Sequence, residues 1–434
     1  MTVGGKQIHY AWLIFVGCCL LTIGGFPLVY SLLAVYLLPV SSGLGINTAD
    51  VSIWLSADGL AALAAMPLAG YLLQKKNINV CMTVGALLTI AGIAGFAFAA
   101  NAYHFIICGL FIGFGMPYLF GLAEVMLIGN WFAVKYQGRV LGISMGCLGL
   151  AVAVWSPLFT WLVQNLGFQT TYLINAALVA VLILPWTLFV FKRDPADKNL
   201  LPYGVEEGHS DDALEADAHV GMRPGKAFRT VGFWMVYIAA CTTSIGMAFD
   251  NHQPSIAIEF LAPDVMSVDA AVSFSGWLLS CYGIGQVAGT FGFGWLLDRM
   301  KMKPVYGLFL VMFAATFAVW TFWHSQAGLV AAALLLGTHN GLATVGYPLL
   351  IRRLFGGKYY SRIYSIVNMS TAFLGGLATT LVSLSYDALG SYANVIMVAF
   401  CLICCIAVCS FVAMSRIGKY KWEDDGCAPA LQQV

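Results

Sequence analysis

Gly70-Tyr-Leu-Leu-Gln-Lys-Lys76 ends one apolar run of the chain, and Gly294-Trp-Leu-Leu-Asp-Arg-Met300 ends another, 224 positions later. A second set of aromatic and basic residues repeats at an offset of 223: Phe132, Lys135 and Arg139 match Phe355, Lys358 and Arg362. Two independent segments thus agree on one long internal repeat. Self-similarity of this kind indicates a chain built from two related halves.

The composition indicates that lipid surrounds most of this chain. Of its 434 residues, 60% are hydrophobic and 9% are charged, whereas soluble domains carry about 25% charged residues. The net charge of +1 gives no indication of a nucleic-acid partner. The first apolar run, 11–36, is too long for the core of a cleavable signal peptide, so we expect a retained first span.

The apolar runs predict the number of spans. A helix needs about 20 residues to cross a hydrocarbon core of about 30 Å. Twelve runs meet this requirement, six on each side of a polar stretch: 11–36, 51–73, 80–100, 105–127, 140–163, 171–191, 231–256, 271–296, 304–322, 327–350, 363–386 and 392–413. The expected fold class is therefore an all-α membrane protein, with twelve transmembrane helices in two pseudo-symmetric six-helix bundles. We expect the bundles at 1–191 and 230–415, a cytoplasmic linker at 192–229 and a tail at 416–434.

The basic residues predict the orientation of the spans. If the N-terminus is cytoplasmic, none of the 21 Lys and Arg falls in the outer loops, which are 37–50, 101–104, 164–170, 257–270, 323–326 and 387–391. Cytoplasmic loops of membrane proteins carry such an excess of basic residues. We therefore expect a multi-pass protein of the cell membrane with both termini in the cytoplasm. No Lys or Arg lies deep in a span, so the sequence offers no buried cation for an anionic solute.

With its two six-span halves, the chain resembles the major facilitator superfamily over nearly its whole length. Gly294-Trp-Leu-Leu-Asp298-Arg299 is similar to that superfamily's inner-loop signature, although Gln74 replaces the acid in the first copy. More narrowly, the chain resembles the oxalate/formate antiporter and monocarboxylate transporter group in several segments: Trp131-Phe132, Gly138-Arg139, Gly167-Phe-Gln, Arg193-Asp-Pro, Leu201-Pro-Tyr-Gly, Phe228-Arg-Thr-Val-Gly-Phe-Trp and Leu354-Phe355-Gly356.

The resemblance implies alternating access, with the solute near the midplane between the halves. It also implies a gate at the inner loops, formed by Gly294, Asp298 and Arg299 and by the repeat-related Arg139 and Arg362. In such a gate the acid caps the N-terminus of a neighbouring helix. The alternative is that Asp298 and Arg299 are an ordinary charge pair at the end of a span.

Polar residues cluster in the seventh span. Asp250-Asn251-His252-Gln253 precede Pro254, which lacks an N–H donor and clashes with the carbonyl of Asp250. We expect the helix to kink or break here, about 25 Å from its inner end, and to expose polar backbone that only a cavity can satisfy. Asp250 or His252 would then carry a proton, and His252 could bind the solute. The alternative is a helix end already in contact with water.

Three further spans carry polar or ionisable side chains, which are costly in lipid and usually functional. His339 and Asn340 lie near the midplane of the tenth span, where they line a cavity or His339 bonds a neighbouring carbonyl. Glu124 and Asp58 lie about 10 Å from the inner and outer ends of their spans, respectively. Either could hold a proton, because burial favours the uncharged carboxyl. Either could instead reach the interface or another helix.

The resemblance implies carboxylate recognition by basic residues, but those residues are absent here. Thr290 and Thr371 stand where the family has an arginine in span 8 and a lysine in span 11. An unpaired dianion in that position would cost about several kcal/mol. Hydrogen-bonding side chains remain as candidate solute ligands: Tyr30, His252, Tyr282, Gln286, Thr290, His339, Asn340, Asn368 and Thr371.

These features predict a secondary active transporter that moves a small organic solute by alternating access with proton symport or exchange. The resemblance favours a monocarboxylate-like solute. The residues favour a proton-coupled carrier or efflux pump for a neutral, cationic or amphipathic compound. We expect no enzyme activity, since no nucleophile and base lie at matched depth, and no cofactor or metal site. The expected partners are the solute, the lipid bilayer and transported protons, and the expected state is a monomer.

Overall fold

The computed structural model describes residues 2–3, 6–7, 9–204, 221–246, 248–261, 266–297, 299–356 and 359–420. The described chain is helical apart from a short antiparallel hairpin of strands β1 (Thr2–Val3) and β2 (Lys6–Gln7). Asp298, one of the candidate gate residues, lies outside the described residues.

The first half contains six spans. They are formed by α1 (Tyr10–Gly24), η1 (Pro27–Ser31), α2 (Leu33–Leu44), α3 (Thr48–Lys75), α4 (Ile78–Phe96), α5 (Ala102–Gly115), η2 (Met116–Tyr118), α6 (Leu122–Trp131), α7 (Val134–Pro185) and η3 (Trp186–Val190). The long α7 holds both the fifth and the sixth span. Gly167 separates them with φ 76° and ψ 161°, a conformation that favours glycine.

The second half repeats this arrangement after a connection that contains two short helices, η4 (Pro195–Lys198) and α9 (Pro224–Ala227). Its spans are formed by α10 (Val231–Gly246), α11 (Ala248–Leu261), α12 (Val268–Leu297), α13 (Met302–Phe322), α14 (Gln326–Thr338), η5 (Leu342–Gly346), α15 (Tyr347–Phe355), α16 (Tyr360–Leu389) and α17 (Ala393–Met414).

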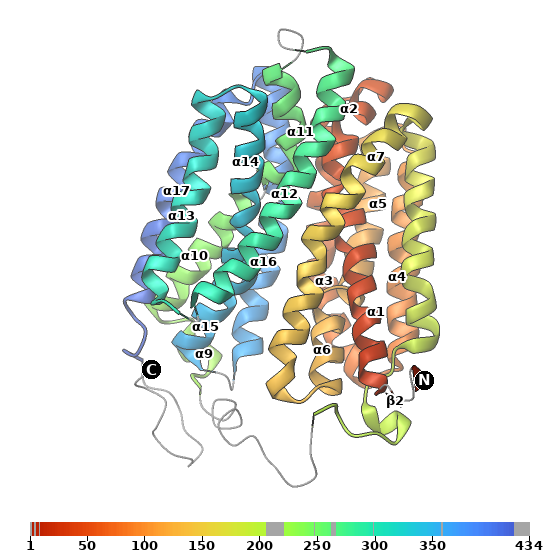
Figure 1. Ribbon diagram of the computed structural model, residues 1–434, viewed down its shortest axis with the longest axis vertical. Helices are drawn as coiled ribbons and strands as arrows, with labels where there is room; N and C mark the ends of the chain where they lie inside the picture. The colour runs from red at the N-terminus through yellow and green to blue at the C-terminus, as the bar shows by residue number, and fades with distance from the viewer. Residues whose placement is uncertain are drawn as a thin grey trace.

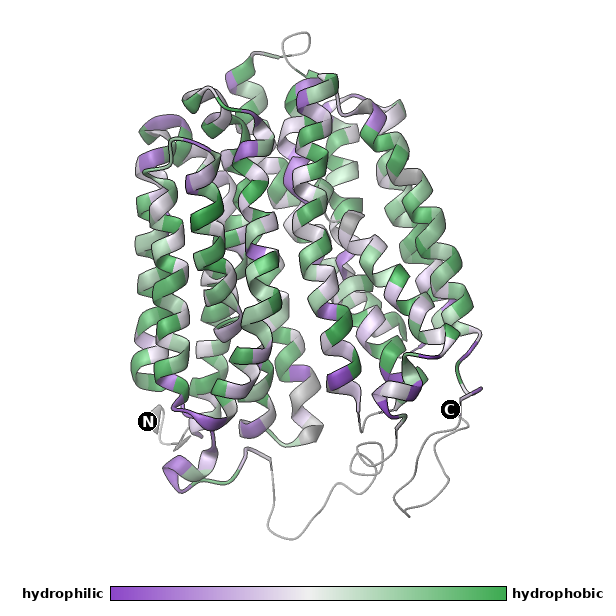
Figure 2. Ribbon diagram, turned by 180° about the vertical axis from the view of Figure 1, so that it is seen from behind, coloured by the Kyte–Doolittle hydropathy of each residue, from purple (hydrophilic) through white to green (hydrophobic). Residues whose placement is uncertain are grey.

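The helices confirm the twelve-span membrane fold. Ten stretches of the described chain are long and apolar enough to cross a membrane, and one of them, Arg139–Val190, contains the two spans on either side of Gly167. The 30-residue α12 completes the second half. Figure 1 shows the two bundles side by side, and Figure 2 shows hydrophobic residues along the middle of the helices with hydrophilic ones toward both ends.

The two ends of the molecule differ in charge. Figure 1 shows the start of α1, the end of α17 and the short helix α9 of the connection at the same end of the bundle. Described basic residues such as Lys75, Arg193 and Arg352 belong to helix ends and loops at that end. We call it the basic end. The opposite end, which we call the far end, carries acidic residues such as Glu259 and Asp387.

Three spans are interrupted within the described chain: the first and fourth in the first half, and the tenth, which is equivalent to the fourth, in the second half. The first passes from α1 to α2 through the π-helical η1, which contains Pro27. The fourth turns at Gly121, whose φ is 75°. The tenth ends α14 ahead of His339 and continues through η5. Discontinuous helices of this kind surround the solute and ion sites of many transporters.

The seventh span does not break at Pro254. The described helix α11 runs from Ala248 to Leu261, and Pro254 lies inside it. Of the expected kink or break at Asp250–Pro254, the break is therefore not present. Proline removes only the bond to the carbonyl four residues earlier, and the surrounding turns of α11 continue past that one gap.

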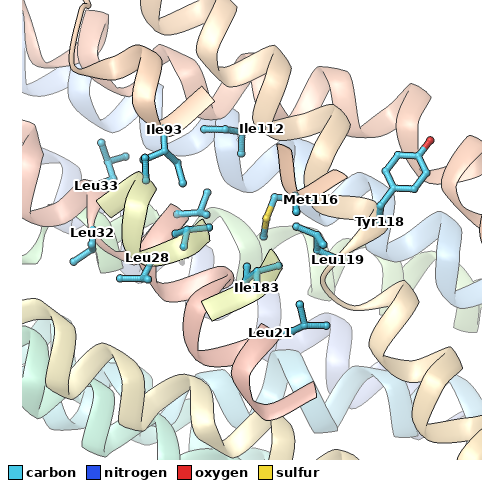
Figure 3. Packing of buried hydrophobic residues seen from close by; sticks show 14 of the residues in the cluster. Leu21, Leu28, Leu32, Leu33, Ile93, Ile112, Met116, Tyr118, Leu119 and Ile183 are labelled. Atoms are coloured by element: carbon cyan, nitrogen blue, oxygen red, sulfur yellow. The ribbon is translucent and has the colours of Figure 1, made fainter. Parts of the chain in front are cut away.

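Close packing of small and apolar residues fixes the interrupted spans in place. In the first half, Leu28 and Leu32 of the first span meet Met116 and Leu119 of the fourth in one cluster (Figure 3). Glycines bring neighbouring backbones into direct contact, which stabilises helix pairs in lipid. A Cβ added at Gly113 would overlap the carbonyl of Asp58, and one at Gly337 would overlap the carbonyl of Tyr282.

The halves are joined toward the far end by two repeat-related sets of hydrogen bonds. Between α3 and α16, the hydroxyls of Ser56 and Thr380 lie 2.8 Å apart. Between α12 and α7, Ser280 Oγ donates to the carbonyl of Ala153 at 2.7 Å. Ser56 and Ser280 are related by the repeat offset of 224. Each bundle therefore uses the same position of its second helix to hold the other.

One member of this junction carries a charge. Asp387 of α16 accepts from Thr48 Oγ1 at 2.8 Å and from the Ala49 N–H at 2.9 Å, so it caps the N-terminus of α3 in the other half. A carboxylate is stabilised there by free N–H groups and the helix dipole. The repeat-related residue is Gln164, whose Nε2 donates to Ser273 Oγ at 3.1 Å. The two junctions thus differ by one negative charge.

Candidate functional site

A cluster of polar side chains lies inside the second bundle, where the seventh, eighth and tenth spans meet. Tyr282 of α12 donates its hydroxyl to Asp250 Oδ2 of α11 at 2.8 Å. His339 Nε2 lies 3.8 Å from the same carboxylate oxygen, and Asn340 Nδ2 lies 3.5 Å from the Tyr282 hydroxyl. With the buried Gln286 of α12, these residues form what we call the Asp250 cluster.

Three atoms of this cluster have no hydrogen-bond partner within the described chain although they are buried: Asp250 Oδ1, His339 Nε2 and Gln286 Oε1. Leaving such a group unsatisfied costs about 1–3 kcal/mol. Native proteins keep unpaired buried groups mainly where a ligand, a water or a functional role accounts for them. The Asp250 cluster is therefore the best candidate for a solute site in this bundle.

The hydrogen bond of His339 indicates how many protons His339 and Asp250 share. Its Nδ1 contacts the carbonyl of Leu336, and its ring stacks on Phe313 with the centroids 4.8 Å apart. A carbonyl only accepts, so Nδ1 donates, and in neutral His339 the lone pair of Nε2 faces Asp250. Two facing lone pairs repel, so the pair is favourable when His339 or Asp250 carries one additional proton.

The first bundle contains a related pair with the two residue types exchanged. Tyr30 of η1 donates its hydroxyl to Asp58 of α3, at 3.1 Å from Oδ1 and 3.2 Å from Oδ2. Asp58 is related to Tyr282 by the repeat offset of 224. The acid thus stands on the second span of the first half and on the first span of the second half. Tyr30 stacks against Trp54 and contacts Phe26, with centroids 5.9 and 4.8 Å apart.

Glu124 forms a third buried acidic site, between the first, fourth and fifth spans. Its Oε1 accepts from Thr22 Oγ1 at 3.1 Å and from Ser144 Oγ. Its Oε2 is buried without a hydrogen-bond partner in the described chain. The structure thus places three of the four predicted proton-binding residues as buried carboxyls at three different helix junctions.

His252, which the sequence grouped with Asp250, points into a different environment. Its Nδ1 lies 3.0 Å from the Tyr392 hydroxyl and its Nε2 lies 3.2 Å from the carbonyl of Thr379. Residues two apart on a helix face nearly opposite directions. His252 therefore links α11 to α16 and α17, while Asp250 faces α12. Asp250 and His252 therefore contact different helices.

The remaining predicted ligands lie apart from the Asp250 cluster in the described contacts. Thr371 Oγ1 donates to the carbonyl of Asn368 at 2.8 Å, and Asn368 is exposed. Thr290 is half-buried one turn along α12 from Gln286. Thr290 and Thr371 thus occupy the positions at which the resemblance expects basic solute ligands, and neither side chain bonds a member of the Asp250 cluster in the described contacts.

The candidate gate residues lie at the basic end. The guanidinium of Arg299 stacks over the Trp295 ring, with its carbon 4.0 Å from the ring centroid. Arg139 and Arg362 are exposed, and a Cβ at Gly294 would meet open space. This contact of Arg299 stays within its own helix end, and Asp298 itself lies outside the described residues.

Sequence reasoning missed two features of the site. It named Tyr30 and Tyr282 as candidate solute ligands and did not predict that both hydroxyls bond a carboxylate. It also missed Asp387, which lay in an expected outer loop. A comparison of repeat-related positions would have drawn attention to these residues, because the offsets relate Asp58 to Tyr282 and Gln164 to Asp387.

Comparisons with known proteins agree with this architecture. The family model described as Major Facilitator Superfamily matches residues 14–267 and 254–424. Monocarboxylate transporter 12 of Rattus norvegicus is 22% identical over 321 residues, covering 68% of this chain and 62% of that protein. Monocarboxylate transporter 13 of Bos taurus is 24% identical over 362 residues, covering 80% of this chain and 76% of its own length.

The match to the rat relative thus spans less than two thirds of that relative's length. Among solved structures, the crystal structure of the nucleoside transporter NupG superposes with a TM-score of 0.71 and 14% identity, covering 95% of this chain and 100% of that one. At this identity the superposition establishes the shared fold.

Proposed function

Because this chain belongs to the Major Facilitator Superfamily of membrane transporters, we propose that it moves a small organic solute in a proton-coupled cycle, and that the solute binds at the Asp250 cluster. The observation that carries the proposal is the buried Asp250 carboxyl, which has one oxygen on Tyr282 and the other without a described partner. Ionisable groups inside a membrane bundle usually mark solute or proton pathways.

The charges of the interior favour a solute without net negative charge. Asp58, Glu124 and Asp250 place three carboxyls inside the spans, while the described Lys and Arg belong to helix ends and loops at the basic end. An anion beside Asp250 would have no opposing charge in a low-dielectric medium, which costs about several kcal/mol. A neutral molecule that donates hydrogen bonds, or an organic cation, fits this cluster better.

A monocarboxylic acid is the second candidate, because the curated relatives are named monocarboxylate transporters. It becomes compatible with the Asp250 cluster when the carboxyl enters together with a proton, since the pair then has no net charge. In that case uptake follows the concentration of the protonated acid. We also propose that the basic end faces the cytoplasm, because cytoplasmic loops carry the excess of Lys and Arg.

Uptake into proteoliposomes tests the proposal. Purified protein is reconstituted, and accumulation of radiolabelled pyruvate, uridine and tetraethylammonium is measured with and without an imposed pH gradient. We expect the pH gradient to drive accumulation of uridine or tetraethylammonium. If pyruvate is the solute, we expect it to accumulate only when it enters from the acidic side of the membrane. Gradient-independent exchange of the pyruvate anion would contradict the proposed charge preference, and accumulation of none of the three would contradict the proposed solute class.

A further inference from the structure

Glu124 is a buried acid that the Asp250 cluster does not use. Its side chain is 0% exposed, and it lies in the first bundle, between α1, α6 and α7. We propose that Glu124 binds the coupling proton, at a site separate from the solute. This inference rests on the proposed proton-coupled transport. It assigns solute binding to the second half and proton binding to the first half.

The polar contacts of Glu124 fit a carboxylic acid. Thr22 and Ser144 both donate to Oε1, and Oε2 has no partner in the described chain. The titratable groups beside it are thiols: Cys18 of α1, and Cys147 of α7, which itself bonds Cys19. Two hydroxyls and thiols supply no positive charge. A buried carboxylate without a cationic partner is costly in lipid, so the neutral acid is the stable form in this state.

The second bundle shows what the same position looks like without an acid. The offset of 223 relates Glu124 to Tyr347. The Tyr347 hydroxyl lies 2.8 Å from Thr243 Oγ1 of the seventh span, just as Glu124 bonds Thr22 of the first. Both bundles therefore keep a hydrogen bond between equivalent spans at this level. A phenol keeps its proton at neutral pH whereas a carboxyl can release it, so only the first bundle can exchange a proton here.

The position of Glu124 explains how the proton could be released. Thr22 lies two residues before α1 ends at Gly24, and Glu124 lies two residues after α6 begins, beside Gly121 with its φ of 75°. Thr22 and the acid thus flank the interruptions of the first and fourth spans. Opening of the first bundle at these interruptions during the transport cycle would admit water to Oε2. Glu124 then passes its proton to water on one side and takes one from hydronium on the other.

The test compares Glu124→Gln with Tyr347→Phe, its repeat-related control. Glutamine keeps the size of the side chain and an oxygen that accepts from Thr22 and Ser144, so we expect the variant to fold. Infrared spectra of the purified proteins are recorded across an acid-to-alkaline titration. We expect a protonated-carboxyl C=O band at neutral pH in wild type and in Tyr347→Phe, and a band that is smaller by the contribution of one carboxyl in Glu124→Gln. An unchanged band in Glu124→Gln at every pH would overturn the assignment.

Transport supplies the second readout, with whichever of pyruvate, uridine and tetraethylammonium the wild-type protein accumulates. We expect Glu124→Gln to lose accumulation driven by a pH gradient while it retains counterflow, in which labelled and unlabelled compound exchange without net proton movement. Retained accumulation, or equal loss of counterflow, would overturn the inference. If wild type carries none of the three, the proposed function fails, while the infrared result still decides whether Glu124 holds a proton.

Discussion

The two halves of this molecule each hold a tyrosine–aspartate hydrogen bond between their first and second spans, with the two residue types on opposite spans. In the first half, Tyr30 of the first span donates to Asp58 of the second. In the second half, Tyr282 of the second span donates to Asp250 of the first. The consequence is unequal: both oxygens of Asp58 face one tyrosine, whereas Asp250 keeps one unpaired oxygen and has His339 beside it. Both halves thus contain a tyrosine–aspartate contact, but only the aspartate of the second half keeps an oxygen without a described partner.

The largest difference between the halves should appear when each acid is made neutral. We expect Asp250→Asn to abolish both accumulation and counterflow, because it removes the carboxyl that faces His339 and the unpaired site. Asp58→Asn should retain counterflow, since asparagine still accepts from the Tyr30 hydroxyl. Counterflow of the compound that wild type carries, measured in proteoliposomes for both variants, checks this. Equal loss in the two variants would show that the exchanged pairs have equivalent roles.

A smaller effect is expected when each tyrosine loses its hydroxyl. Tyr282→Phe leaves Asp250 without its described donor, at a cost of about 1–3 kcal/mol, which corresponds to about a 5- to 150-fold weaker solute affinity. Tyr30→Phe should lower the thermal unfolding temperature and leave KM unchanged, because Asp58 lies away from the solute. KM and the melting temperature in detergent, measured for both variants, separate the two effects. A raised KM in Tyr30→Phe would place the first-half pair in the solute site.

The smallest effect concerns the far-end junction, where Asp387 and Gln164 occupy equivalent positions. Removal of a helix cap costs about 1 kcal/mol, so Asp387→Ala should shift the equilibrium toward far-end opening about fivefold. Gln164→Ala, which removes a neutral contact with Ser273, should shift it less. Spin-label distances between the two halves at the far end measure both populations. A larger shift for Gln164→Ala would show that the charge of Asp387 does not strengthen the junction.

Much of the fold could be predicted from the sequence because it depends on hydropathy and charge summed over long segments. Span length, the absence of deep basic residues and the repeat offset each draw on many positions, so one misplaced boundary changes little. The break expected in the seventh span is absent because the prediction relied on Pro254 alone, and the turns of α11 on either side of it remain helical.

The candidate site was less predictable because it depends on which way each side chain points. Asp250 and His252 are adjacent in the sequence pattern, yet they contact different helices. Asp58 and Glu124 could be identified as costly buried acids, but their hydroxyl partners come from other spans that no local pattern connects. The offset of 224 relates Asp58 to Tyr282, but it relates Tyr30 to Pro254 and not to Asp250, so it reveals only one member of each pair.

Proton movement during solute entry tests the central claim most directly. Proteoliposomes that contain a pH-sensitive dye are exposed to uridine, tetraethylammonium or pyruvate, with wild type and Asp250→Asn measured side by side. The account predicts that entry of the accepted compound changes the internal pH in wild type, and that Asp250→Asn shows neither entry nor pH change. Solute entry without proton movement in wild type, or unchanged entry in Asp250→Asn, would contradict it.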